Sequence, residues 1–248
     1  MKRLIKQIVT SSTYKQSSII SKEKLAADPD NILISRGPRT RLTAEGVRDL
    51  ALASSGLLVK EIGGPSVKVY QPKGIWESST SGRGVLAHYV QDHGEKLYRR
   101  GLYSFIKRTV PPPGMLVFDG SNRDQCEVNR MRTNTPLQAL VLLNEPLMLE
   151  AARVFAERLM LEKSTPEEKV KKAFQTIVCR QPKQEELTIL LQYFDQEKTG
   201  FNQYPDKARE FIAAGEYKHE KINDVISLAA LMQVVQTIYN LDEAISKT

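Results

Sequence analysis

Cysteine, histidine and long apolar runs are all scarce in this sequence, and each shortage excludes a class of protein. The 248 residues include three histidines and two cysteines. Two cysteines are too few for a disulfide framework. No Cys-x-x-Cys-His motif occurs, so the chain itself attaches no c-type haem, and we expect no cofactor on it. No apolar run reaches the roughly 18 residues that a membrane helix needs. We therefore expect no membrane span.

The first residues also lack the features of an export signal. They are basic, but Lys6 and Gln7 interrupt the apolar stretch after two residues, so no signal peptide is predicted in this chain. The spacing of Leu4, Ile5 and Ile8 instead predicts an amphipathic helix.

Positive charge is abundant but unevenly distributed. The net charge is +7 and the isoelectric point is near 9.3. Residues 1–135 carry 22 Lys and Arg against 12 Asp and Glu, whereas residues 136–248 carry 14 against 17. The basic residues form no tract of five or more, and they accompany neither a helix-turn-helix nor an RNP pattern. We therefore expect no specific binding of nucleic acid.

Helical periodicity dominates the apolar pattern. Apolar residues from Val170 to Val178 recur with the spacing of one helix face, whereas no segment alternates with period two. Proline and glycine break residues 62–76 into a loop. We predict a mainly α fold, an irregular helical domain with long Pro/Gly-rich loops. One domain is expected over residues 1–248, with a basic, loop-rich half to residue 135 and a helical half over 136–248.

The middle of the chain makes the most specific local predictions. The sequence Thr135–Gln138, TPLQ, predicts a capping box with proline at the first helical position. The following Leu137–Leu143 is apolar nearly all round, which predicts a buried helix. Upstream, the periodicity predicts a helix over residues 95–106 that Pro111 terminates. The three prolines at 111–113 predict a stiff, extended strut.

The densest polar cluster lies between the prolines and Thr135. Its candidate ligand-binding residues are Asp119, Arg123, Arg130, Arg132 and Asn134. The arginine fork suits planar oxyanions, so the cluster is a candidate for binding a carboxylate, a sulfate or sugar hydroxyls. The alternative is an ion-pair network that fastens the proline strut to the helix at Thr135. The alternative is favoured because no base or nucleophile lies near the cluster.

Other reactive side chains lack the pattern of a catalytic group or a metal ligand. Cys126 has no histidine close in sequence, although a nucleophilic cysteine needs a histidine or a helix N-terminus. The spacing of His88, Asp92 and His93 fits no compact metal signature. We therefore expect no catalytic residue and no metal site on this chain.

A long, ordered series of motifs carries a resemblance to a known family. The stretch LYRRGLYSFIKRTVPPPGMLVFDGSNRDQCEVNRMRTNTPLQALVLLNEP, with RGPRTRL and GGPSVKVYQPKGIWE upstream, resembles the C-terminal domain of unknown function of planctomycete cytochrome-c-domain (PSD1-type) proteins. The resemblance covers nearly the whole chain, although FDGSNR departs from the family pattern around Asp119. It implies a C-terminal fragment of a larger exported protein, whose haem c is often carried by a separate upstream module.

The resemblance implies a location and partners but no reaction. It places the chain in the periplasm or outside the cell, with the upstream domains of the parent protein as partners and polysaccharide as a candidate ligand. We expect a non-catalytic scaffold or binding module that binds carbohydrate or an anionic ligand. The alternative is a carbohydrate-active or redox-associated enzyme domain that uses Asp119 and the neighbouring arginines.

Overall fold

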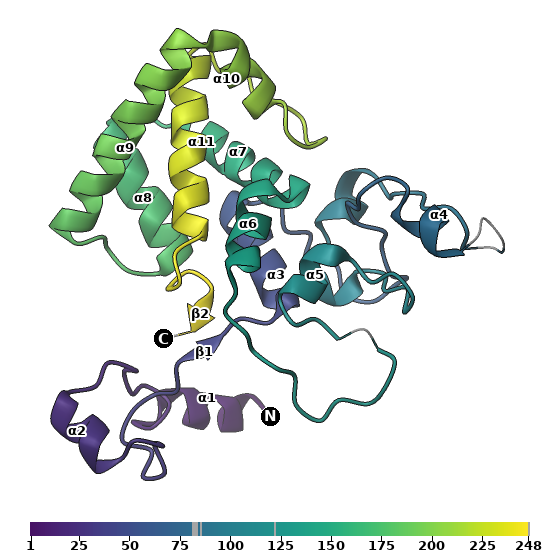
Figure 1. Ribbon diagram of the computed structural model, residues 1–248. Coiled ribbons are helices and arrows are strands. Elements are labelled where there is room, and N and C mark those ends of the chain that lie inside the picture. Colours follow the sequence, from purple (N-terminus) through teal and green to yellow (C-terminus); the bar gives the residue numbers. More distant parts are fainter. Residues whose placement is uncertain (81–83, 85, 122, 248) are drawn as a thin grey trace. The chain divides into compact units, whose positions relative to one another are not determined.

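A computed structural model describes residues 1–80, 84, 86–121 and 123–247 (Figure 1). The fold is mainly α, as predicted, because the described part holds eleven α-helices and one two-stranded sheet. The chain forms two compact units, Met1–Leu42 with Ile245–Thr248, and Thr43–Ala244. The single domain expected over the whole chain stays a prediction, and the expected division at residue 135 falls inside the larger unit.

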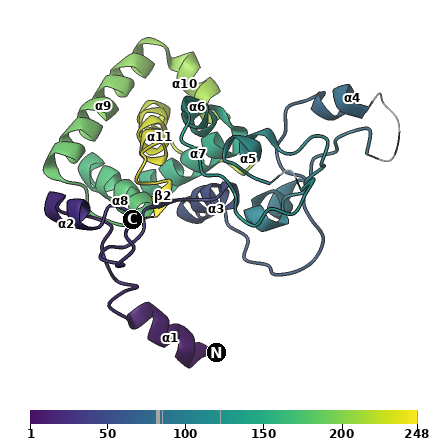
Figure 2. The ribbon, with the colours of Figure 1, turned by 60° about the horizontal axis from the view of Figure 1, so that its bottom comes forward.

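The smaller unit is basic and buries almost none of its apolar side chains. Its elements are α1 (Lys2–Thr10), α2 (Lys22–Ala27), and β1 (Thr40–Arg41) paired antiparallel with β2 (Ser246–Lys247) (Figure 2). Asp28 is the one buried residue among residues 1–42, and its carboxylate accepts hydrogen bonds from the backbone of Ile32 and Leu33 at 2.8 and 3.0 Å. The predicted amphipathic helix is present as α1, but its apolar side chains are exposed.

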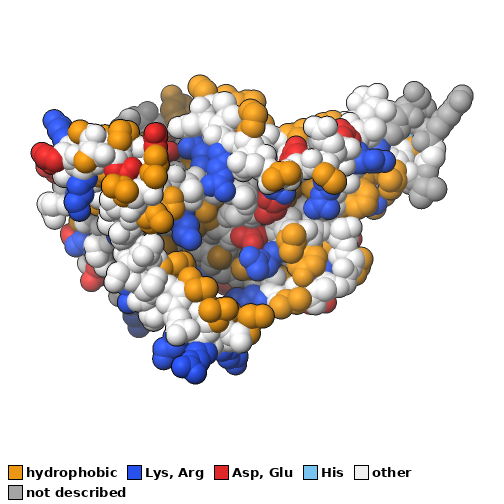
Figure 3. Space-filling model, turned by 90° about the horizontal axis from the view of Figure 1, so that it is seen from below, with side chains coloured by type: hydrophobic (Ala, Val, Ile, Leu, Met, Phe, Trp, Pro, Cys, Tyr) orange, Lys and Arg blue, Asp and Glu red, His pale blue; other side chains and the backbone are white. Residues whose placement is uncertain are grey.

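All of the net charge lies in this smaller unit. It contains ten Lys and Arg against three Asp and Glu, a net charge of +7, so the larger unit is electrically balanced. Basic and apolar side chains also occur together on the face of the molecule in Figure 3. An unburied apolar surface with this charge is the usual composition of a region that contacts another molecule.

The larger unit is built around one central helix. Its elements are α3 (Ala44–Ser55), α4 (Ile75–Thr80), two short 3₁₀ helices (Gly94–Tyr98 and Gly101–Tyr103), α5 (Pro113–Val117), α6 (Pro136–Asn144), α7 (Pro146–Met160), α8 (Pro166–Val178), α9 (Gln184–Gln203), α10 (Pro205–Ile212) and α11 (Val225–Tyr239). Helix α11 is apolar nearly all round, buries 11 of its 15 residues and packs against α7, α8, α9 and α10 (Figures 1 and 2). A helix with apolar residues on every side is stable only when neighbours surround it. Within the described residues, no helix combines the length and apolarity needed to cross a membrane.

Local sequence signals set several helix starts. The Thr43 side chain accepts a hydrogen bond from Gly46 N at 3.1 Å, and Thr165 and Glu168 form a reciprocal capping box, so a threonine N-cap begins each of these two helices. Thr135 makes no such bond, so the predicted capping box there is wrong. The amide of Gln138 instead donates to Val117 O at 2.9 Å.

Helix α6 differs most from its prediction. It was expected to be buried all round, but Leu137 and Leu140 are 54% and 55% exposed, while Gln138 and Leu142 are buried. The helix packs on α5, α7 and α11 through one side only. Its remaining leucines therefore form an exposed apolar surface.

Two further local predictions are corrected. Residues 95–106 form two 3₁₀ turns rather than one helix, because Arg99 and Ser104 form parallel bridges with Val59 and Val67 and must be extended. The third proline, Pro113, occupies the first turn of α5. The extended strut is therefore shorter than predicted.

Helix α7 carries a buried carboxylate, Glu150, that ties three segments together. The side chain is 0% exposed and accepts hydrogen bonds from Tyr98 Oη at 3.0 Å, Tyr70 Oη at 3.2 Å and Tyr217 N at 2.7 Å. Arg153, one turn later, is also 0% exposed and donates to the carbonyls of residues 214 and 217. Polar groups on α7 therefore fix loops that come from both ends of the larger unit.

We predict that Glu150→Ala strongly destabilises the larger unit. Removal of the carboxylate leaves one buried and two part-buried donors without their acceptor. A buried unsatisfied donor costs about 1–3 kcal/mol, so the free energy of unfolding should fall by at least about 2 kcal/mol. Urea unfolding followed by far-UV circular dichroism measures the loss. The control is Glu162→Ala, which breaks an exposed pair with Lys172 and should change stability by less than about 1 kcal/mol. Equal effects of the two substitutions would contradict the prediction.

Candidate ligand-binding site

Asp119 is a structural residue at the base of a long loop. It follows α5 in the left-handed region, with φ 56°. Its carboxylate accepts hydrogen bonds from Thr133 N at 2.6 Å and from Thr133 Oγ1 at 3.0 Å. This contact closes the loop over residues 119–133, so both carboxylate oxygens already have donors.

Arg130 fastens the same loop to α3. Its Nη1 atom lies 3.0 and 2.9 Å from the two carboxylate oxygens of Glu45, in the first turn of that helix. Burial raises the pKa of Glu45, but hydrogen bonds from its backbone and from Arg130 outweigh it and hold the pKa below the usual value. Arg130 is thus an ion-pair partner, as the favoured interpretation of the cluster expects.

The other predicted binding residues point to no shared site. Arg123, Arg132 and Asn134 are exposed, and Arg123 has a positive φ of 61°. No ion pair formed by described residues joins two of the five predicted residues. The structure therefore separates Asp119 and Arg130, which hold the loop, from three exposed side chains on it.

A groove in the larger unit is a better candidate for a binding site. It encloses about 410 Å³, within the range of about 300–1,000 Å³ that is typical of small-ligand pockets. Three segments form it, namely Tyr70–Pro72, Pro112–Gly114 and the junction of α6 with α7. Its lining residues are Tyr70, Gln71, Pro72, Pro112, Pro113, Gly114, Leu140, Val141, Asn144, Glu145 and Pro146.

The junction of α6 with α7 places Glu145 in the groove. A residue before proline is disfavoured in the helical region, and Glu145, which precedes Pro146, is extended with φ −66° and ψ 131°. Helix α6 therefore ends at Asn144, and Pro146 begins α7. Glu145 belongs to neither helix and lines the groove at the corner between them.

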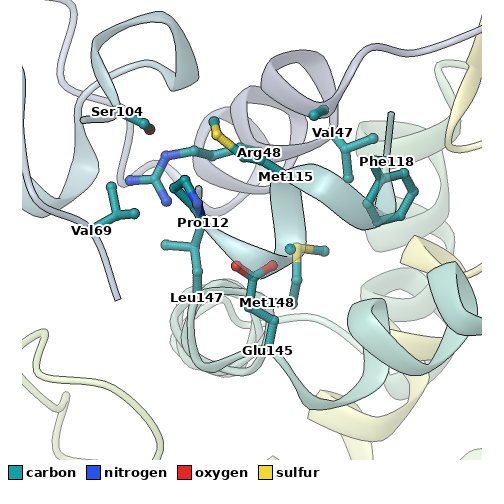
Figure 4. Close-up of a pocket in the computed structure, with 12 residues that line it drawn as sticks. Val47, Arg48, Val69, Ser104, Pro112, Met115, Phe118, Glu145, Leu147 and Met148 are labelled. Carbon is teal, nitrogen blue, oxygen red and sulfur yellow. The ribbon is translucent and has the colours of Figure 1, made fainter. Parts of the chain in front are cut away.

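Behind the groove lies a small inner cavity of about 20 Å³, large enough for about one water molecule. Arg48 on α3 and Glu145 reach into it from opposite elements (Figure 4). Arg48 is 8% exposed; it donates to Leu97 O, but its Nε has no partner. A buried guanidinium with an unused donor is uncommon.

Desolvation and charge act on the Glu145 carboxyl in opposite directions. Burial raises its pKa above the ordinary value, and the positive charge of Arg48 partly opposes this shift. Among the described residues, none donates a hydrogen bond to this carboxylate, and it forms no direct ion pair with Arg48. Glu145 is therefore a hydrogen-bond acceptor that the protein itself leaves unused.

The opposite wall of the groove is held rigidly. Tyr70 Oη donates to Glu150 and accepts from Glu216 N at 3.1 Å, and burial raises the pKa of its phenol. Trp76 is fully buried, and its Nε1 donates to Gln71 Oε1 at 2.8 Å. These three hydrogen bonds fix the segment that carries the groove residues Tyr70–Pro72.

Sequence reasoning missed Glu145. The tripeptide Asn144–Pro146 signals the start of a helix, and a glutamate before proline is ordinary at that position. Its environment is created by Arg48 and Gly114, which come from distant parts of the sequence. The one local signal was a lone carboxylate between two strongly apolar segments.

The described residues contain no group of three or more His, Cys, Asp or Glu side chains placed to hold a metal ion. Cys126 and Cys179 are both unpaired and exposed. The lining of the groove itself provides hydrogen-bonding groups and apolar side chains.

Comparison with known proteins gives one match. The model of a family described as "PSD1: Protein of unknown function (DUF1553)" matches residues 1–194. No curated protein and no solved structure matches the chain.

We predict that Asp119→Ala lowers the free energy of unfolding by about 1.5–3 kcal/mol, because hydrogen bonds to a charged group are lost. Asp119→Gly should recover part of that loss, since glycine adopts a positive φ freely. Arg132→Ala should change stability by less than about 0.5 kcal/mol. Chemical denaturation of the three variants gives these values. A loss for Arg132→Ala as large as that for Asp119→Ala would refute the structural role of Asp119.

Proposed function

The chain belongs to the PSD1 family of proteins of unknown function (DUF1553), and on that premise we propose that it is a non-catalytic binding module of a larger exported multidomain protein. The ligand lies in the groove between Tyr70–Pro72, Pro112–Gly114 and Leu140–Pro146. The module acts in the periplasm or outside the cell, and its protein partners are the other domains of that larger protein.

One observation carries the proposal: the groove has the volume and the lining of a ligand site. Its 410 Å³ are bounded mainly by proline and aliphatic side chains, and Glu145 is the single charged residue among the eleven that line it. Ligand sites are typically apolar concavities with a few polar groups that orient the ligand. The rigid Tyr70 wall and the proline segments also limit the entropy lost on binding.

The arrangement of acidic groups supports a binding role over a catalytic one. Glycoside hydrolysis needs two carboxyl groups on either side of the scissile bond. Asp119, the carboxylate of the alternative enzyme hypothesis, is engaged by Thr133. Glu145 lines the groove without a second carboxylate among the lining residues.

The exposed arginines favour a separate role for the 119–133 loop. Arg123 and Arg132 are exposed, and their positive charge suits the polysaccharide or anionic ligand expected from the sequence. The groove carries a negative charge instead. Any anionic ligand therefore belongs to this loop and not to the groove.

The smaller unit supports membership of a larger assembly. Its residues 1–42 bury no apolar side chain and expose many. Apolar surface of this extent is ordinarily covered by another domain.

Filling the groove should abolish binding. Leu140→Trp places an indole in the groove, whereas Leu137→Trp, one turn earlier and equally exposed, adds the same group outside the lining. We predict that Leu140→Trp lowers the affinity for aromatic fragments, measured by saturation-transfer NMR, at least about tenfold. The Leu137→Trp variant should bind the fragments with the affinity of the wild type. An absence of fragment binding to the wild type, or equal binding to both variants, would contradict the proposed site.

A further inference from the structure

Building on the proposed function, we infer that the groove selects ligands that join an apolar body to a cationic group, with Glu145 as the acceptor for that cation. The apolar body contacts the prolines and Leu140. The cationic group donates hydrogen bonds to the carboxylate. An alkylammonium or guanidinium head, free or on a peptide side chain, has this chemistry.

The first argument is that Glu145 lines the groove and has no hydrogen-bond donor among the described residues. A carboxylate accepts several hydrogen bonds, and no described residue supplies one to Glu145. Glu145 is half-buried, and a ligand that covers its carboxylate without donating a hydrogen bond to it incurs a desolvation penalty. A cationic donor in the groove removes this penalty and gains a charge-assisted hydrogen bond.

The second argument excludes an anion as the groove ligand. Arg48 lines the inner cavity and is absent from the groove lining, whereas Pro112, Gly114 and Glu145 line both spaces. These three residues therefore form the partition between the two. The inner cavity, about 20 Å³, holds no more than about one water molecule. Glu145 is therefore the charged residue that the groove lining presents to a ligand, and Arg48 is not part of that lining.

The third argument concerns what surrounds the carboxylate. A Cβ atom on Gly114 would lie 2.7 Å from Glu145 Oε1, so the carboxylate lies directly against this glycine and a side chain there would collide with it. Arg48 adds a positive charge that favours the ionised carboxylate. Gly114 and Arg48 thus act as positioning residues for Glu145.

Three ligands with the same apolar body test the inference. Binding of 2-phenylethylamine, 2-phenylethanol and 3-phenylpropanoate to the full chain is measured by titration NMR at pH 7. We expect the amine to bind about tenfold more tightly than the alcohol, because it gains one hydrogen bond to a charged group. The carboxylate should bind most weakly. Glu145→Gln should lower the affinity for the amine to that for the alcohol. It should change the affinity for the alcohol by less than about twofold.

The outcomes separate this inference from the proposed function. If no ligand binds, the groove is not a binding site and the proposed function fails. If all three bind equally, or the carboxylate binds best, the groove binds ligands but the selectivity for cations is wrong. Circular dichroism checks that Glu145→Gln is folded.

Gly114→Ala, which crowds Oε1 and keeps the carboxylate, supplies a second test and should also lower the preference for the amine.

Discussion

The peptide link between Glu145 and Pro146 is the constraint on which the candidate site depends. Proline excludes the preceding residue from the helix, so the apolar stretch of α6 and α7 bends at this point instead of forming one long helix. The bend creates a corner that the proline segment of α5 and the Tyr70 segment enclose. The same link places Glu145, the single charged residue among the described lining residues, at this corner.

The rigidity of the groove comes from α7. Its first residues form one side of the corner, and Glu150, one turn further, anchors Tyr70 on the opposite wall. Helix α7 in turn packs against the buried central helix α11. The site therefore draws its geometry from the best-packed part of the larger unit, which is the arrangement that preserves a preformed binding surface.

Local signals account for part of the local structure. The mainly α fold follows from periodicity, and the caps at Thr43 and Thr165 involve atoms within three residues of each other, so their sequence contains all the necessary information. The exposure of Leu137 and Leu140 was not predictable in this way, because an apolar helix is buried only where neighbours are available. The extended backbone at Arg99 and Ser104 likewise depends on distant bridge partners.

The site was harder to predict than the fold because its chemistry is assembled from distant segments. The cluster around Asp119 is conspicuous in sequence, but hydrogen bonds to Thr133 and an ion pair with Glu45 account for two of its five residues. Glu145 is inconspicuous in sequence and becomes notable only beside Gly114 and Arg48. A lone carboxylate without a donor among the described residues, rather than dense charge, marks the candidate site.

An experimentally determined structure of the chain with 2-phenylethylamine tests the central claim most directly. The account predicts the ammonium nitrogen within about 2.7–3.2 Å of a Glu145 carboxylate oxygen, with the phenyl ring between the Pro113 segment and Leu140. An amine bound elsewhere, or a Glu145 carboxylate turned away from an occupied groove, would contradict it.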